Sequence, residues 1–232
     1  MKQTLSVKEY SRLEKRRKAM ERDHMIEWDF EHDNGENPKA LEVAKKFVDE
    51  FPTLRQNGTG LFIFGSAGSG KSFMAAEIVN ALTDLGHKCY LTTLLGLCNE
   101  LENRTGEMRA RFLERLFCLE LLVLEDFGMQ ADTPLNRQRL LYIVRTCQQL
   151  RILLIFTTAY SLETLMKTGG GGENKKPPEL MTNIRRCTLD FTMQMPPTRR
   201  NRMLQQRRQS KRMLNVTEPV APVQQTLPLE EK

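Results

Sequence analysis

The stretch GSAGSGKS, residues 65–72, decides the fold of this chain. It satisfies the phosphate-loop pattern G-x-x-x-x-G-K-[ST], and it lies between an apolar run of strand length, GLFIFG, and an amphipathic stretch, FMAAEIVNALTDLG, that is typical of a helix. Glycines in such a loop let the backbone curl so that successive N–H groups point at phosphate oxygens, and the dipole of the following helix favours the same anion. In this context the pattern predicts a nucleotide-binding loop rather than a plain glycine-rich turn.

The loop and the start of its helix supply the predicted nucleotide contacts. Lys71 is expected to reach the β- and γ-phosphates of ATP as a point charge, and the hydroxyl of Ser72 is expected to ligate Mg²⁺. The residues predicted to bind the nucleotide are Gly65, Ser66, Ala67, Gly68, Ser69, Gly70, Lys71, Ser72 and Phe73. ATP and Mg²⁺ are therefore the predicted cofactors.

A second informative stretch is ELLVLEDFGM, residues 120–129. Its apolar residues 121–124 predict a strand buried on both faces, and such strands belong to parallel sheets flanked by helices. The two carboxylates that follow should emerge at the carboxyl end of the sheet, where ligands of open parallel sheets bind. In phosphate-loop nucleotidases one acid there serves the Mg²⁺ shell and the next orients the attacking water. We therefore assign Glu125, together with Ser72, to the metal and Asp126 to the water.

The remaining pattern alternates strands with helices. Strands are predicted at KCYLTTL (88–94), RILLIFTTA (151–159) and, at an edge, TLDFTM (188–193), with helical stretches between them. This alternation predicts an α/β fold with a doubly wound parallel sheet flanked by helices. The glycine-rich stretch 168–179 is expected to be a mobile loop. We expect an ATPase domain over residues 31–213, ending in a basic helix, and a disordered, proline-rich tail over residues 214–232.

Residues 1–30 are predicted to form a basic helical arm. The apolar residues Tyr10, Leu13 and Met20 are too sparse in this charged stretch for a core face, so we expect an exposed helix. Such a helix is either simply solvated or a docking segment for a partner, and the pattern leaves both interpretations open.

Charge and composition narrow the class of partner and compartment. The net charge of +6 is concentrated at the C-terminal end, where residues 181–232 carry 10 basic and 4 acidic side chains. Such a basic segment favours a polyanion partner, above all nucleic acid, over a merely solubilising role. The five cysteines form no C-x-x-C pair and are predicted to be reduced thiols. Without a signal sequence or an apolar run of membrane length, the expectation is a cytoplasmic protein with no membrane partner.

With these motifs in hand, the sequence resembles the AAA+ ATPases of the DnaC, DnaI and IstB kind. The likeness covers about residues 28–202 and rests on FEHDNGENPKA, LFIFGSAGSGKSFMAAEIVNAL, ELLVLEDFG, TTAYSLETL and PTRR. The resemblance implies an ATPase that forms an ATP-dependent homo-oligomer, binds single-stranded DNA and loads a replicative hexameric helicase of the DnaB type. The alternatives are an IstB-like transposition helper ATPase and a nucleotide-binding interaction protein with little hydrolysis.

Three departures from the family pattern bear on catalysis. The family's metal-side acid is usually Asp where this chain has Glu125, and Ala159 stands where many relatives have an Asn sensor, although the neighbouring Thr158 is a partial substitute. The helix that carries the family's trans-acting arginine lacks a clean Asp-Arg pair, which leaves Arg185 or Arg186 as the candidate. The resemblance assigns the later sensor arginine to Arg199, with Arg200 as a competitor. Together these departures favour an ATP-binding switch with slow turnover over a fast motor.

Overall fold

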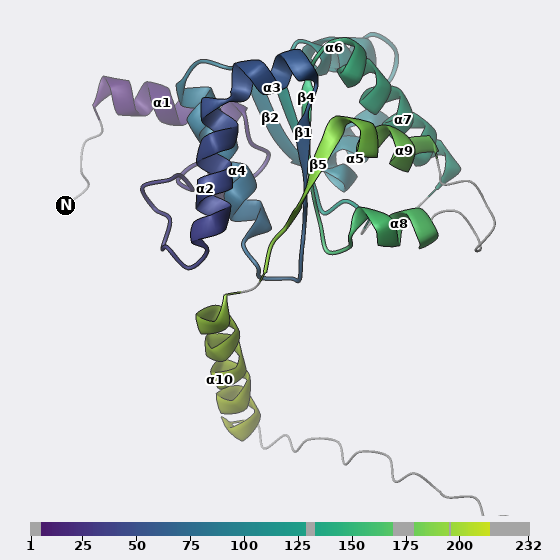
Figure 1. Ribbon diagram of the computed structural model, residues 1–232. Coiled ribbons are helices and arrows are strands. Elements are labelled where there is room, and N and C mark those ends of the chain that lie inside the picture. Colours follow the sequence, from purple (N-terminus) through teal and green to yellow (C-terminus); the bar gives the residue numbers. More distant parts are fainter. Residues whose placement is uncertain (1–5, 129–132, 169–178, 195, 214–232) are drawn as a thin grey trace, which may run out of the picture. The chain divides into compact units, whose positions relative to one another are not determined.

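The computed structural model describes residues 6–128, 133–168, 179–194 and 196–213 (Figure 1). The chain divides into two compact units, Met1–Met195 and Pro196–Lys232. The strands of the first unit are β1 (Gly60–Phe64), β2 (Cys89–Thr93), β3 (Leu121–Glu125), β4 (Leu153–Thr158) and β5 (Thr188–Thr192). Its helices are α1 (Val7–Lys18), the 3-10 helix η1 (Asp23–Met25), α2 (Pro38–Asp49), α3 (Phe51–Asn57), α4 (Lys71–Asp84), α5 (Leu94–Asn103), α6 (Gly106–Phe117), α7 (Pro134–Gln149), α8 (Leu162–Thr168) and α9 (Glu179–Cys187).

The strands of the described residues pair into one parallel sheet in the order β2-β3-β4-β1-β5. The predicted α/β fold with a parallel sheet is therefore confirmed, and β5 lies at an edge as predicted. Because β4 separates β1 from β3, the segments that follow these two strands emerge on either side of the end of β4. This order brings the phosphate loop after β1 and the carboxylates after β3 to the same edge of the sheet.

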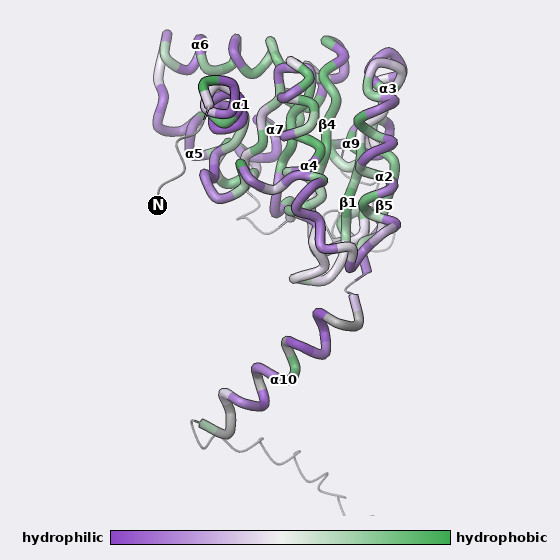
Figure 2. Tube along the Cα trace, turned by 90° about the vertical axis from the view of Figure 1, so that its left-hand side faces the viewer, coloured by the Kyte–Doolittle hydropathy of each residue, from purple (hydrophilic) through white to green (hydrophobic). Residues whose placement is uncertain are grey.

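Two apolar layers cover the sheet, one on each face. Alternate strand residues such as Ile63 and Val123 pack against α2, α3 and α4, whereas Phe62 and Leu124 pack against α5 to α9. Figure 1 shows these two groups of helices on opposite sides of the strands, and Figure 2 shows hydrophobic residues concentrated along the strands. Helix α4 begins at the phosphate loop and is buried along most of its length, so the site rests on a well-packed helix.

The second unit contains α10 (Pro197–Met213), which is predominantly hydrophilic (Figure 2). It confirms the predicted basic helix, since its described arginines are Arg199, Arg200, Arg202 and Arg208. The predicted tail, residues 214–232, and most of the predicted mobile loop at 168–179 lie outside the described residues. Within the described parts of the chain, no helix is long and apolar enough to cross a membrane.

The N-terminal segment differs from the expected exposed arm. Helix α1 does start at the surface, where a Ser6 cap begins it and Tyr10 is 61 % exposed. After α1, however, the chain contributes to the core beside α2 and α4 through Ala19, Met20, Met25 and Ile26. The expectation that this stretch has too few apolar residues for the core is therefore wrong for its second half. The reason is that these residues come from an irregular segment around η1 and not from one face of a helix.

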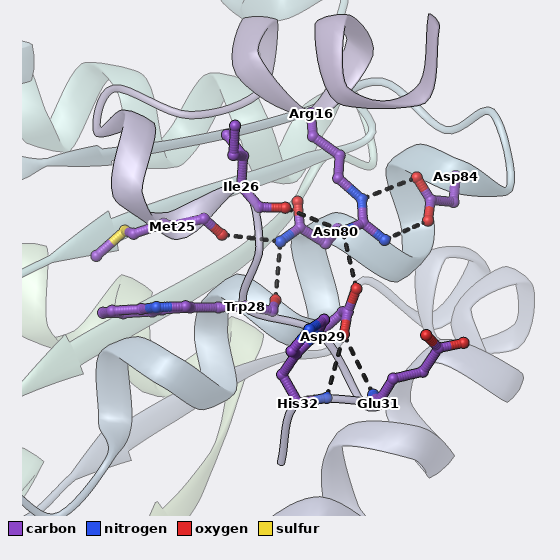
Figure 3. A network of polar contacts seen from close by, with 9 residues as sticks. All are labelled: Arg16, Met25, Ile26, Trp28, Asp29, Glu31, His32, Asn80 and Asp84. Carbon is purple, nitrogen blue, oxygen red and sulfur yellow. Dashed lines mark hydrogen bonds and ion pairs between the residues drawn. The ribbon is translucent and has the colours of Figure 1, made fainter. Parts of the chain in front are cut away.

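A buried arginine anchors this segment (Figure 3). The side chain of Arg16 is only 4 % exposed, and its Nε and Nη2 donate to the two carboxylate oxygens of Asp84 in α4 at 3.0 and 2.5 Å. Its Nη1 donates to Asp29 Oδ2 at 3.0 Å and to the carbonyl of Ile26 at 2.9 Å. Burial of the charge is compensated because several guanidinium N–H groups find acceptors.

Helix α4 also holds the following turn by its backbone. The side-chain amide of Asn80 donates to the carbonyls of Met25 and Trp28 at 2.9 and 2.8 Å (Figure 3). Residues 16–29 are thus fixed against the same helix that starts at the phosphate loop, which joins the N-terminal segment to the nucleotide site.

Candidate nucleotide-binding site

The phosphate loop leaves β1 and is tied to β4 at its start. The N–H of Gly65 donates to the carbonyl of Thr158 at 3.2 Å. Gly68 and Gly70 have φ values of 77° and 101°, in the left-handed region that glycine adopts at no steric cost. Gly70 is also the N-cap of α4, and among the described residues no side chain caps this helix end. The N–H groups of the first helical turn are therefore suited to bind an anion.

Lys71, the first residue of α4, folds back over this loop. Its Nζ donates to the carbonyls of Gly65 at 2.8 Å and Ser66 at 3.0 Å. Burial lowers the pKa of Lys71, and the charges of Asp126 and Glu125 act in the opposite direction. The two acids are thus close enough to Lys71 for their charges to favour its protonated form.

Glu125 ends β3 as a fully buried carboxylate. Its side chain is 0 % exposed, and neither carboxylate oxygen has a hydrogen-bond partner among the residues that the structure describes. Burial raises the pKa of Glu125, whereas the side chain of Ser72 and the charge of Arg22 act to lower it. A buried carboxylate without hydrogen bonds is costly unless a cation binds it.

Buried oxygen atoms without hydrogen bonds in the described chain fit a bound ATP·Mg²⁺. The hydroxyl of Ser69 in the loop is likewise buried without a partner in the described chain. Mg²⁺ is usually held by one or two protein oxygens together with phosphate oxygens and water. Ser72 and Glu125 are near one another and would supply the protein oxygens, and the loop N–H groups and Lys71 would receive the phosphates.

Asp126 follows Glu125 in a strained backbone conformation. Its φ is 55°, in the left-handed region that is uncommon for residues other than glycine. The N–H of Asp126 donates to Thr157 Oγ1 at 3.3 Å, while its carboxylate is more than half exposed. The turn therefore directs two adjacent acids differently, one into the protein and one toward solvent.

The hydroxyl of Thr158 makes two hydrogen bonds within this turn. Its hydroxyl donates to the carbonyl of Phe127 at 2.6 Å and accepts from the N–H of Tyr160 at 3.2 Å. A hydroxyl has a single donor, so Thr158 keeps none for a phosphate or a water. The expectation that Thr158 partly replaces the missing sensor is therefore not supported by this geometry, and Ala159 has no polar side chain to do so.

Comparisons with known proteins identify the family of this chain. The family model of IstB-like ATP binding proteins matches residues 2–169, which is more than half of the chain. The chain belongs to the IstB-like ATP-binding proteins. No curated protein matches the sequence at a significant level.

The IstB-like chain shares its fold with solved structures of replication proteins. It is similar to DnaI with 19 % identity and a TM-score of 0.59, covering 77 % of this chain and 96 % of that one. It is similar to the DnaC helicase loader with 21 % identity and a TM-score of 0.57, covering 69 % and 92 %. A putative primosome component from Streptococcus pyogenes serotype M3 gives 18 % identity and a TM-score of 0.62, covering 83 % and 96 %. The fold is that of the AAA+ P-loop ATPases, as the sequence resemblance predicted.

The structure adds to this IstB-like site a residue that no sequence motif indicates, Arg22. Arg22 Nη1 lies 3.8 Å from Glu125 Oε2, and its Nη2 lies 3.8 Å from Asp126 Oδ2. The preceding residue, Glu21, accepts from the Thr92 hydroxyl at 2.6 Å and from the Thr93 N–H at 3.0 Å. The N-terminal segment is thereby held at the carboxyl end of β2, beside the acids of β3. No local sequence pattern distinguishes Arg22 from the other charges around it.

The other predicted arginines do not join this cluster within the first unit. Arg185 and Arg186 are exposed in the last turn of α9, on the face of the sheet covered by α5 to α9. Arg199 belongs to α10 in the second unit. Their assigned roles stay predictions, and exposure of the α9 pair is compatible with action on a neighbouring subunit.

Proposed function

We propose that this protein is an accessory ATPase of DNA replication that loads a hexameric helicase of the DnaB type onto single-stranded DNA. The observation that carries the proposal is the buried Glu125 beside the phosphate loop, whose carboxylate oxygens accept no hydrogen bond within the described residues, on a fold shared with DnaI and the DnaC helicase loader. The exposed start of α1, with Val7 87 % and Tyr10 61 % exposed, offers an apolar contact for the partner.

In this proposal, different residues of the chain bind the phosphates, hold Mg²⁺ and orient the attacking water. The loop N–H groups and Lys71 bind the phosphates and fix the nucleotide in register. Bound Mg²⁺, held by Ser72 and Glu125, would neutralise charge on the phosphates. Asp126, with its carboxylate open to solvent, orients the attacking water. Arg185 or Arg186 of a neighbouring copy supplies positive charge at the γ-phosphate, so the active site depends on an ATP-bound oligomer.

Turnover in this site is proposed to be slow. Glu125 is one methylene longer than the aspartate usual in the family, Ala159 lacks a polar group, and the Thr158 hydroxyl is already used within the turn. The protein would therefore act as an ATP-dependent switch. A steady-state rate within roughly 1–100 per second, the range of many phosphoryl transferases, would contradict this part of the proposal.

Single-stranded DNA binding is assigned to the basic helix α10. Its arginines would contact phosphates without reading sequence, so the affinity should fall steeply with salt. Reversal of two described charges, Arg200→Glu with Arg208→Glu, should weaken binding and flatten its salt dependence. A salt dependence equal to that of the unchanged protein would contradict the role of α10.

One experiment tests the loader function directly. The protein is mixed with the replicative helicase of its host, with and without ATP·Mg²⁺, and the mass in solution is measured by size exclusion with light scattering. A defined complex whose formation or release depends on nucleotide supports the proposal, and the Lys71→Ala variant should lose that dependence. Absence of a complex in both conditions overturns it.

The second candidate is an IstB-like transposition helper, which the family match favours. This function requires binding to duplex DNA rather than preference for single strands. Competition of the two DNA forms for the protein, with ATP·Mg²⁺ present, separates the candidates, because a loader prefers the single strand and a transposition helper prefers the duplex.

A further inference from the structure

The N-terminal segment brings a cation to the metal side of the nucleotide site. Arg22 is the residue between the chain's anchor on β2 and η1, with an extended backbone at φ −114° and ψ 113°. Its two terminal nitrogens lie 3.8 Å from one carboxylate oxygen of Glu125 and one of Asp126, respectively. One guanidinium therefore spans both acids to which the proposed function gives Mg²⁺ and the attacking water.

The position of Arg22 is fixed on both sides. On the N-terminal side, residues 19–21 extend the sheet, with Leu91 N–H donating to the carbonyl of Ala19 at 2.8 Å and Glu21 N–H donating to that of Leu91 at 3.0 Å. On the C-terminal side, Asn80 binds the carbonyl of Met25 at 2.9 Å. The backbone around Arg22 is thus attached to β2 and to α4. From this position its side chain reaches the acids at the end of β3.

The contact itself is a loose ion pair. A separation of 3.8 Å exceeds hydrogen-bond length, the Arg22 side chain is 40 % exposed, and both oxygens of Glu125 are without a hydrogen bond in the described chain. Mg²⁺ carries twice the charge and binds oxygen at about 2.0–2.1 Å, so it interacts far more strongly with the same carboxylate. Lys71, the other cation near these acids, is already bonded to the loop carbonyls.

We propose that Arg22 is a cis-acting positioning residue that occupies the cation place beside Glu125 and Asp126 in the nucleotide-free protein and is displaced when ATP·Mg²⁺ binds. This inference rests on the proposed ATP·Mg²⁺ site and adds a coupling between that site and the N-terminal segment. Release of the guanidinium removes the contact between residue 22 and the end of β3, and the N-terminal segment around η1 thereby responds to the state of the nucleotide.

A tryptophan in the N-terminal segment can report its coupling to the nucleotide site by fluorescence. Trp28 is the single tryptophan of the sequence and lies in the same segment, with its ring centroid 5.5 Å from that of Phe73 in the first turn of α4. Its fluorescence should change when ATP·Mg²⁺ displaces Arg22, and should change much less with ATP in the presence of EDTA.

The test compares Arg22→Ala with Arg17→Ala. Arg17 is a matched control because its described ion pairs are with Glu14 and Asp23 and not with the site acids. Binding of a fluorescent ATP analogue is titrated with Mg²⁺ for both variants and the unchanged protein. Loss of a competing surface cation worth up to about 1 kcal/mol should lower the half-saturating Mg²⁺ concentration roughly fivefold in Arg22→Ala and leave it unchanged in Arg17→Ala.

Each outcome decides the inference. An unchanged or raised Mg²⁺ requirement in Arg22→Ala overturns it, since a competitor cannot be removed without easing metal binding. In the Glu125→Gln background the effect of Arg22→Ala should largely vanish, and an undiminished effect would overturn it as well. Failure of the proposed ATP site is seen separately, because the unchanged protein and Lys71→Ala would then both fail to bind the analogue.

Discussion

The carboxylate of Glu21 accepts a hydrogen bond of 2.6 Å from the hydroxyl of Thr92 and so fixes the N-terminal segment to the sheet. A Cβ at position 96 would lie 2.6 Å from Glu21 Oε1, so the Glu21 side chain would have to shift if position 96 carried a larger residue than glycine. Gly96→Ala should therefore stabilise α5 by helix propensity but expel the carboxylate of Glu21. We expect the substitution to be neutral or destabilising in the native sequence, and stabilising by about 0.5–1 kcal/mol in a Glu21→Ala background.

Denaturant unfolding of the unchanged protein, Gly96→Ala, Glu21→Ala and the double variant measures the coupling between positions 21 and 96. A Gly96→Ala effect that is the same with and without Glu21 would show that the two residues do not compete for space. Thr92→Val removes the donor but keeps the size of the side chain. It should reproduce part of the decrease in the free energy of unfolding that Glu21→Ala causes.

Arg16 should be essential to stability although it is a charged residue of a charged helix. Arg16→Met leaves Asp29 and Asp84 without their buried partner, and breaking such a pair typically costs about 3–5 kcal/mol. The adjacent Arg17→Met removes only surface ion pairs and should change the free energy of unfolding by less than about 0.5 kcal/mol. Equal effects of the two substitutions in denaturant unfolding would contradict the buried network.

The strands around the site could be predicted from the sequence because their signals are local. The apolar run before Glu125 and the glycine pattern around Lys71 specify β3, β1 and the loop within a few residues each. In contrast, the burial of Arg16 depends on Asp84, which lies 68 positions further along the chain. Arg22 and Glu125, which are also in contact, lie even further apart along the chain. Neither pair leaves a periodic pattern, so charge alone predicted an exposed arm.

Glu77 of α4 should make stability depend on pH. Burial and the negative charges of Asp33 and Asp29 raise the pKa of Glu77 to about 8. The positive charge of Lys45 acts in the opposite direction. Between its unfolded pKa near 4.5 and 8, the folded state holds a proton that the unfolded state releases. Stability should consequently fall as the pH rises through this window and not change further from this group above it.

Glu77→Gln tests that dependence while preserving the shape of the side chain. The variant should gain stability relative to the unchanged protein at pH 8, on the order of a few kcal/mol, and the difference should shrink toward pH 5. Denaturant unfolding at several pH values gives both curves. Parallel curves for the two proteins would exclude Glu77 as the titrating group.

The docking role of α1 is best tested by surface substitution. Deletion of residues 1–25 is a less selective test, because it also removes Arg16, Met20 and Arg22 and so destabilises the core and alters the nucleotide site. Loss of partner binding in the deleted protein would then have two causes.

Val7→Ser with Tyr10→Ser changes only the exposed start of α1, where the two side chains are 87 % and 61 % exposed. We expect this double variant to keep the stability and nucleotide affinity of the unchanged protein within about 0.5 kcal/mol. Its binding to the replicative helicase, measured by light scattering as above, should weaken at least about tenfold if these residues are central contacts. Full retention of helicase binding would remove this face of α1 from the docking surface.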